Sequence, residues 1–319
     1  MPDTPPIPPD LRVIDTGYLR PRFDAVYLLC HAGRAAFIDA GTHHALPRLL
    51  AALAEAGLAP EAVDYVILTH VHLDHAGGAG QLMAALPRAR LVVHPRGAPH
   101  MIDPGRLVAG AAAVYGQARM RALYGDILPV EAARVQAAPD GTRLDLAGRA
   151  LHLLDSPGHA RHHLCVHDPA GAALFTGDAF GLCYRELDTP AGPFVVPTTS
   201  PVQFDPEAWT GTLDRLLALG ARWACPTHYG PVTGVPALGR QLARRIRALA
   251  GLARACAGLA GEARHTRLLE GQWDYLEGEY RAAGGDLPTA EFRAVLGLDV
   301  EINAQGLAVW LDRQARGAG

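Results

Sequence analysis

The sequence predicts an α/β fold in which sheets and helices pack in layers, and three observations support this prediction. Apolar segments rich in β-branched residues alternate with Ala- and Leu-rich segments of helical periodicity along most of the chain. Strands mixed with helices in this order favour a layered sandwich over an all-α or all-β domain. With 319 residues, the chain is also long enough to bury a large core without disulfide or metal crosslinks.

The first expected elements are a hairpin, a helix and a buried strand. AVYLLC (25–30) and AAFIDAG (35–41) are separated by HAGR, which is a hairpin signal. HALPRLLAALAEAG (44–57) has leucines at helical spacing and ends in a glycine that suits a C-cap. VDYVILTH (63–70) is typical of a buried strand. The later expected elements are a helix at 79–86, a strand at 90–95, a helical insertion at about 98–134, strands within 136–176, a helix at 205–220, a strand at 222–228 and a helical tail from 236.

The chain is expected to divide into three parts. The lead MPDTPPIPPD (1–10) is half proline and has neither the basic start nor the apolar core of a targeting signal, so we expect it to be disordered. Residues 11–235 would form a catalytic domain that contains the insertion, and residues 236–319 would form a helical C-terminal extension. No apolar run in the sequence looks long enough to span a membrane.

The composition argues against several kinds of site and partner. The five cysteines are odd in number, scattered and never spaced as C-x-x-C, which argues against a disulfide framework or a cysteine-based zinc site and fits a reducing cytoplasm. The formal net charge of -3 gives no general electrostatic footprint for nucleic acid. We therefore expect a cytoplasmic protein with neither nucleic acid nor membrane as a partner.

The segment THVHLDHAGG (69–78) concentrates possible metal ligands directly after a predicted strand. Side chains at i and i+2 of an extended segment point the same way, so His70 and His72 should face one point. Asp74 and His75 lie on the turn into the next helix, beside this pair. Imidazole and carboxylate groups suit zinc, iron or manganese, and a catalytic metal needs further ligands from elsewhere. Three more candidates follow predicted strands, namely His159, Asp178 and His228.

Five short segments occur in a fixed order, namely DAG (39–41), THVHLDH (69–75), PGH (157–159), GDA (177–179) and THYG (227–230). Together they resemble the metallo-β-lactamase-fold superfamily of metallohydrolases, on its glyoxalase II-like side, over roughly residues 11–235. The resemblance implies a four-layer αβ/βα metallo-β-lactamase sandwich, to which the helical insertion and the helical C-terminal extension are added.

The resemblance also implies a division of the ligands between two metals. His70, His72 and His159 would hold one metal, the second would be held by Asp74, His75 and His228, and Asp178 would bridge them. Two ions about 3.5–4 Å apart can share a bridging hydroxide near neutral pH. The expected ions are two divalent metals, with zinc preferred over iron or manganese. Asp178 and Asp74 are the predicted catalytic residues, because Asp74 can also orient the nucleophile or accept its proton.

For other residues near these motifs, the sequence supports two interpretations each. Asp39 is expected either to anchor the ligand loop through hydrogen bonds or to serve only as a turn residue. Tyr184 and Arg185 follow the bridging acid closely and could face the substrate, with loop packing as the alternative. His162 and His163 are expected to have surface or packing roles rather than to support the ligands.

The resemblance, together with these residues, implies a dinuclear metallohydrolase that acts on a small-molecule substrate and cleaves a small ester-like bond, either a thioester or a lactone. A cysteine usual in related β-lactam hydrolases is replaced by Asp178, and a glutamate of related flavodiiron proteins is replaced by His72. No basic segment for glutathione is recognisable near the C-terminus. The alternative is an iron-dependent oxidoreductase of the persulfide dioxygenase kind, and a non-catalytic binding module is the third interpretation.

Three helices are expected in the C-terminal extension. Apolar residues recur at steps of three or four from Pro236, a second helix should end before Gly284, and Asn303 can cap a short third helix. These apolar stripes must be buried, either on the sandwich surface or as a wall of the metal cleft that acts with residues 98–134 to set substrate size. The same wall could also form the interface of a homodimer.

Overall fold

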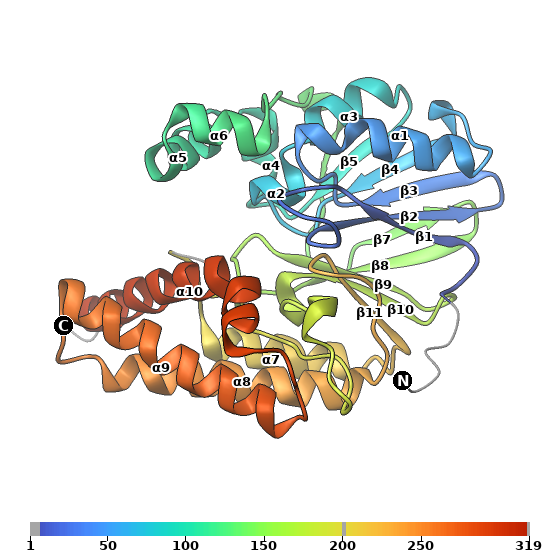
Figure 1. Ribbon diagram of the computed structural model, residues 1–319. Helices are drawn as coiled ribbons and strands as arrows, with labels where there is room; N and C mark the ends of the chain where they lie inside the picture. Colours follow the sequence, from blue (N-terminus) through green and yellow to red (C-terminus); the bar gives the residue numbers. More distant parts are fainter. Residues whose placement is uncertain (1–6, 200–201, 318–319) are drawn as a thin grey trace.

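The computed structural model describes residues 7–199 and 202–317, and it shows two sheets packed face to face with helices on the outside of each (Figure 1). The predicted α/β sandwich with a helical insertion and a helical extension is therefore confirmed. Residues 1–6 of the proline-rich lead lie outside the described residues. Its last residue, Asp10, forms an ion pair with Arg149.

The first sheet has the strand order β1-β2-β3-β4-β5-β6. Strands β1 to β3 pair antiparallel, which includes the predicted hairpin, and strands β3 to β6 pair parallel. The strands are β1 Leu11–Asp15, β2 Ala25–His31, β3 Arg34–Ile38, β4 Val63–Ile67, β5 Arg90–Val93 and β6 Val135–Ala137.

The second sheet has the order β11-β10-β9-β8-β7. Its pairs are antiparallel except for β10 with β11, which run parallel. The strands are β7 Arg143–Leu146, β8 Arg149–Asp155, β9 Leu164–Asp168, β10 Ala173–Gly177 and β11 Trp223–Pro226.

Alternation along the strands builds two apolar layers at once. Phe37 of β3 packs toward the helices that cover the first sheet, whereas its neighbour Ile38 packs between the two sheets. Val66 and Ile67 of β4 divide in the same way. Strands buried on both faces explain why these segments read as continuous apolar runs in the sequence.

The helices fall into three groups. Those that accompany the sheets are α1 Leu46–Glu55, α2 Leu73–Ala76, α3 Ala79–Ala85 and α7 Pro206–Leu217. Those of the insertion are α4 Ala98–Ile102, α5 Gly105–Tyr115 and α6 Gln117–Tyr124. Those of the extension are α8 Val235–Ala255, α9 Gly261–Ala282 and α10 Thr289–Gly317. In Figure 1, α5 and α6 project from one layer and α9 and α10 from the other, on the same side of the molecule.

The last helix differs from the prediction. Asn303 does not cap a short helix, because it lies inside the 29-residue helix α10 and its side chain is fully buried. The segment Thr289–Arg316 also meets the minimum length and mean hydropathy (1.2) of a membrane span, which the sequence had not suggested. Half of its most apolar window is buried within the protein.

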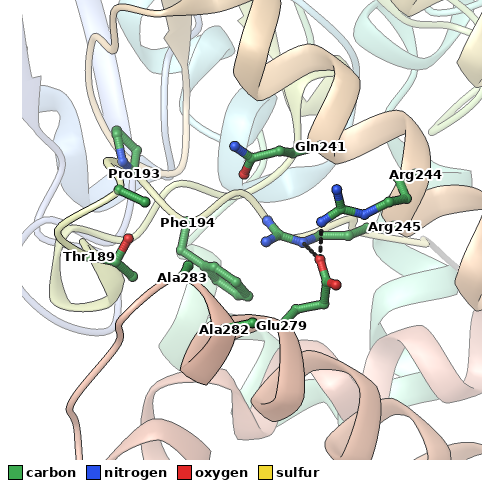
Figure 2. Close-up of a pocket in the computed structure, with 10 residues that line it drawn as sticks. Thr189, Pro193, Phe194, Gln241, Arg244, Arg245, Glu279, Ala282 and Ala283 are labelled. Atoms are coloured by element: carbon green, nitrogen blue, oxygen red, sulfur yellow. Dashed lines mark hydrogen bonds and ion pairs between the residues drawn. The ribbon is translucent and has the colours of Figure 1, made fainter.

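A buried arginine joins the extension to the rest of the chain. Figure 2 shows Arg244 and Arg245 of α8 directed at Glu279 of α9, beside a cavity of about 190 Å³. The guanidinium of Arg245 lies 3.9 Å from the ring centre of Phe194 and donates to the carbonyl of Val195 at 2.6 Å. Burial, only partly offset by Glu279, lowers the pKa of Arg245 to about 10.

Candidate metal centre

All seven predicted ligands lie just beyond the carboxyl ends of strands, where the two sheets meet. His70 and His72 follow β4, and Asp74 and His75 occupy the one-turn helix α2 that comes next. His159 follows β8, Asp178 follows β10 directly, and His228 follows β11.

Two glycines allow the chain to deliver these side chains. Gly177 precedes Asp178 with a φ of +47°, and a Cβ there would lie 2.5 Å from the hydroxyl of Thr69. Gly158 precedes His159 with a φ of +134°, and a Cβ there would lie 2.3 Å from the backbone of Trp209. A larger residue at either position would push the following ligand away.

His70, His72 and His159 form the first group, called here the three-histidine cluster. Nδ1 of His72 lies 2.8 Å from Nε2 of His70 and 3.1 Å from Nε2 of His159. Three nitrogens from two separate parts of the chain therefore converge on one point, which is the arrangement that a metal requires.

Asp74, His75 and His228 form the second group, called here the Asp74 cluster. Oδ2 of Asp74 lies 3.8 Å from Nε2 of His75 and 3.5 Å from Nε2 of His228. The ligand atoms of this group lie within 4.8 Å of one another, so they can surround a second ion.

Asp178 lies between the two clusters. Its Oδ2 is 3.4 Å from Nε2 of His159 and 3.9 Å from Nε2 of His70. Its Oδ1 is 3.4 Å from Nε2 of His75 and 3.6 Å from Nε2 of His228. One oxygen thus faces each cluster, which is the geometry of a bridging carboxylate.

The far nitrogens of four imidazoles are held by other groups, which leaves Nε2 directed at the centre. Nδ1 of His75 lies 3.0 Å from a carboxylate oxygen of Asp39. Nδ1 of His159 lies 2.8 Å from the carbonyl of Thr198, and Nδ1 of His228 lies 2.9 Å from the carbonyl of Phe23. The hydroxyl of Thr69 lies 3.2 Å from Nδ1 of His70. Such contacts fix the ring orientation and the tautomer of a metal ligand.

Asp39 anchors two of the ligand-bearing loops beneath the centre. Its carboxylate accepts the backbone N–H of Thr69 at 2.8 Å and the hydroxyls of Thr69 and Thr227 at 3.0 Å. Together with its contact to His75, these bonds tie the segments that carry His70 and His228 to one buried group. Of the two roles considered for Asp39, the structure shows the anchor.

Electrostatics distinguishes the clusters. Burial, and then the neighbouring imidazoles, hold the pKa values of His70 and His72 well below the usual range, so both rings stay neutral and keep a lone pair. Burial would also lower the pKa of His228, but Asp178 and Asp74 outweigh it and raise the value to about 9. Burial would likewise lower the pKa of His75, but Asp178, and to a smaller extent Asp74, outweigh burial and raise it well above the usual range. The carboxylates around the Asp74 cluster therefore favour positive charge.

The donor set fits metal ions. Nε2 of His75 and Oδ1 of Asp178 are buried and have no hydrogen-bond partner among residues 7–199 and 202–317. Buried polar atoms normally have partners, so lone pairs left without any at a converging set of ligands indicate a cation site. Nitrogen and oxygen donors in this number suit divalent zinc, iron or manganese.

A cavity of about 490 Å³ opens onto the centre. Asp74 and Asp178 line it together with His72, His159 and His228, so both clusters are reachable from one cavity. Residues of α5 and α6 form one side, and residues of α10 form another. Both segments expected to wall the cleft therefore do line it.

The other predicted site residues differ in where their side chains lie. Tyr184 lines the cavity, fully buried, and donates to Asp299 at 3.2 Å. Arg185 is not among the described residues that line the cavity, because its side chain turns to Asp188 at 2.7 Å. His163 is fully buried behind the centre, where its Nε2 accepts the backbone N–H of Asp178 at 3.2 Å, so a surface role is excluded.

Two residues of the tail have roles at the site that the sequence does not predict, and one of them, Asn303, is expected only as a helix cap. Asp299 lines the cavity beside Tyr184. Asn303 accepts the backbone N–H of Thr199 at 2.6 Å and donates to the carbonyl of Pro197 at 2.9 Å, which brackets the Thr198 carbonyl that contacts His159. No local pattern marks either residue, because each role depends on a contact across about a hundred positions.

Comparisons with known proteins point in one direction. The family model described as the metallo-beta-lactamase superfamily matches residues 19–228, which contain all seven ligands. The metallo-beta-lactamase fold-containing protein ST1585 of Sulfurisphaera tokodaii is 27% identical over 67% of this chain and 75% of its own length. Its crystal structure covers 74% of this chain and 85% of that chain, with a TM-score of 0.61.

Two further relatives inform the chemistry. A hydroxyacylglutathione hydrolase of Stenotrophomonas maltophilia is 31% identical over 46% of this chain, and the match spans only 42% of that hydrolase. The protein TTHA1623, solved in a di-iron-bound form, is 30% identical, with 69% of this chain and 95% of that chain covered and a TM-score of 0.50.

Proposed function

The chain belongs to the metallo-β-lactamase superfamily, and from this we propose that it is a dinuclear metal-dependent hydrolase of a small ester-like bond, either a thioester or a lactone. The observation that carries the proposal is the position of Asp178, whose two oxygens face two separate ligand clusters. Two divalent ions bound there would lower the pKa of a water nucleophile and polarise the substrate carbonyl.

Asp74 is placed to handle the proton of the nucleophile. Its side chain is one quarter exposed and lines the cavity, so it is accessible to substrate and water. Burial would raise its pKa, but His75 and His228 outweigh burial and hold the pKa below the usual range. The ionised carboxylate can therefore accept a hydrogen bond from the attacking water.

The bond type is supported by a relative. The Stenotrophomonas maltophilia protein is named as a hydrolase of an acylated glutathione. Its match spans 147 residues of this chain and less than half of the relative, so the ester-like bond comes to this chain as a proposal while the glutathione does not.

Zinc is the metal that we propose, with iron as the alternative. The histidine and aspartate donors accept either ion. The di-iron form of TTHA1623 favours iron, and with iron the chain could act as an oxidoreductase of the persulfide dioxygenase kind. That activity needs one metal held by two histidines and an aspartate, whereas the full Asp74 cluster supports two.

Metal analysis and a substrate panel test the proposal. The purified full-length chain should carry about two metal equivalents and should hydrolyse thioesters or lactones without consuming oxygen. Stoichiometric oxygen uptake with a persulfide would establish the alternative instead. A single tightly bound ion together with no hydrolysis of esters, thioesters or lactones would refute the dinuclear hydrolase.

The Asp178→Asn variant tests the bridge directly. We expect it to lose one metal equivalent and to lower kcat by about 100-fold or more, because an amide cannot place an anionic oxygen at both clusters. Asp214→Asn, at an exposed position of α7, is the matched control and should keep both metals and full activity. Equal losses in the two variants would mean that Asp178 does not bridge.

A further inference from the structure

The cavity above the metal centre is built from segments outside the ligand motifs. Leu107, Ala111 and Tyr115 of α5 form one wall, and Leu298 and Ile302 of α10 form another. Figure 1 shows α5 and α10 on the same side of the molecule, in different layers. These walls therefore define the part of the substrate that extends away from the scissile bond.

Apolar side chains dominate the mouth of the cavity. Leu19, Val202 and Leu298 line it and are 49%, 62% and 43% exposed. Large apolar residues that are exposed together around one opening mark a binding site for an apolar group rather than chance exposure. Further inside, Phe23 and Tyr124 continue the apolar surface toward the metal centre.

Charge on the walls is sparse. Apart from the seven predicted metal ligands, the charged residues among the described lining are Arg106, which is exposed, and Asp299, which is buried. Asp299 lies in the interior, where it accepts a hydrogen bond from Tyr184 at 3.2 Å, and it offers no positive charge to a substrate. A polar, negatively charged group therefore finds little to pair with.

The volume sets the size of the bound group. The cavity measures about 490 Å³, within the range of about 300–1,000 Å³ that is typical of ligand sites. Cavities of this size bind whole small molecules. An acetyl group would leave most of the apolar wall uncovered.

Resting on the proposed hydrolase function, we infer that the substrate carries a bulky, uncharged apolar group, such as a medium-length acyl chain or an aromatic ring, which packs between α5 and α10. The group can belong to the acyl side or to the leaving side of the bond. Glutathione, which is charged and polar, does not fit these walls.

Two series of thioesters test the inference on the metal-loaded, full-length protein. In the first, acetyl, butanoyl and octanoyl groups are carried by one small uncharged thiol. In the second, the acetyl group is carried by benzyl thiol or by glutathione, which are both alkyl thiols and therefore similar leaving groups. We expect kcat/KM to rise on the order of 100-fold from the least to the most apolar member of at least one series. The series that shows the rise identifies the side of the bond that packs in the cavity.

Wall variants provide the structural control. Leu298→Asp and Ala111→Asp, on opposite walls, should each reduce the preference for the apolar member at least tenfold. Leu259→Asp is the matched control, because Leu259 is 38% exposed and does not line the cavity. It should leave the preference unchanged.

The outcomes separate the two proposals. Hydrolysis of all members with equal kcat/KM, or with glutathione preferred, overturns the apolar substrate and leaves the hydrolase function standing. No hydrolysis of any member by protein with two bound metals overturns the hydrolase function, and the inference with it. A preference that survives both wall variants also overturns the inference.

Discussion

Asn303 connects the C-terminal helix to a metal ligand. Its side chain is fully buried and holds the backbone on both sides of Thr198, whose carbonyl lies 2.8 Å from Nδ1 of His159. Groups that orient a metal-binding histidine contribute to affinity although they do not touch the ion. The orientation of His159 therefore depends on a helix that lies beyond the ligand motifs.

The Asn303→Leu variant should weaken the metal site more than an ordinary core change would. We expect the affinity for one of the two metals to fall about 10–100-fold, as when the hydrogen-bonded support of a ligand is lost. Competition with a chelator measures this loss. Gln305→Ala, at an exposed position of the same helix, is the control. A drop in stability with unchanged metal affinity would show that Asn303 supports only the fold.

Asp299 should make the stability of the protein depend on pH. Burial raises its pKa from 3.8 to about 7, against the opposing influence of His228, Tyr184 and Arg20 and with Asp178 adding to the rise. The folded chain therefore holds a proton that the unfolded chain releases above about pH 4, and the contribution to stability falls as pH rises from about 4 to about 7.

The Asp299→Asn variant tests this linkage. Asparagine keeps an acceptor for Tyr184 but carries no charge, so the variant should gain stability relative to the native chain at about pH 8 and much less at about pH 5. The gain in the free energy of unfolding should be larger at about pH 8 than at about pH 5 by on the order of 1–4 kcal/mol, since one pKa unit corresponds to about 1.4 kcal/mol. Denaturant unfolding at the two pH values measures it. An equal effect at both would contradict the raised pKa.

Sequence reasoning located residues whose roles are encoded locally. His70, His72, Asp74 and His75 lie within six positions after a strand, and strand geometry alone directs the first two to one point. Asn303 looked like a helix cap, because its type favours that position, and its actual partners are more than a hundred positions away. The proximity of Arg185 to Asp178 in the sequence did not reveal that its side chain turns to Asp188.

Helix α8 is part of the core rather than an appendage. It buries Leu238, Leu242 and Ile246 in one cluster with Trp209 and Leu213 of α7. Removal of these side chains from the core would expose several apolar groups, each worth about 1.5–3 kcal/mol of burial. The boundary expected at residue 235 therefore does not separate two independent packing units.

A chain that ends at Val235 should consequently fail to fold cooperatively. We expect it to aggregate or to unfold without a sharp transition, because the partners of Trp209 are lost. A chain that ends after Arg313, which lacks the exposed residues 314–316 and those that follow, should keep the transition of the full chain. Thermal unfolding followed by circular dichroism compares the two. Cooperative unfolding of the shorter chain would show that α8 is dispensable.

Helical periodicity predicted some of these segments better than others. The stripe on α8 was clear because one side faces the core and the other faces solvent. The first half of α10 was missed, because the helix packs against both α8 and α9 and also lines the cavity, so its apolar residues surround it. A helix buried on several sides leaves no single stripe in the sequence.

The molecule as a whole should depend on its metals for stability. Nε2 of His228 lies 3.5 Å from a carboxylate oxygen of Asp74 and 3.6 Å from one of Asp178, so the two acids lie close together. Bound cations would neutralise both carboxylates. An ion present at 1,000 times its dissociation constant stabilises the folded state by about 4 kcal/mol. We expect removal of the metals by a chelator to lower Tm by roughly 5–15 °C, and re-addition should restore it. An unchanged Tm after verified metal loss would contradict this expectation.

The order of strands and helices was sufficient to predict a layered α/β sandwich, because two periodicities alternate along the chain. Which faces the insertion and the extension would cover was left open in the sequence. Periodicity shows that a stripe must be buried but carries no information about its partner, and the partners of α10 are the neighbouring helices α8 and α9.

The separation between the ligands and the walls has a consequence for how such proteins diverge. The seven ligands lie between residues 70 and 228, whereas α5 and α10 supply much of the surface that a substrate would touch. Substitutions of the residues in these two helices that line the cavity would alter the surface offered to a substrate without changing a ligand. Homologues with identical ligand motifs can therefore have adopted different substrates, and their specificity should be inferred from the sequences of these helices rather than from the motifs.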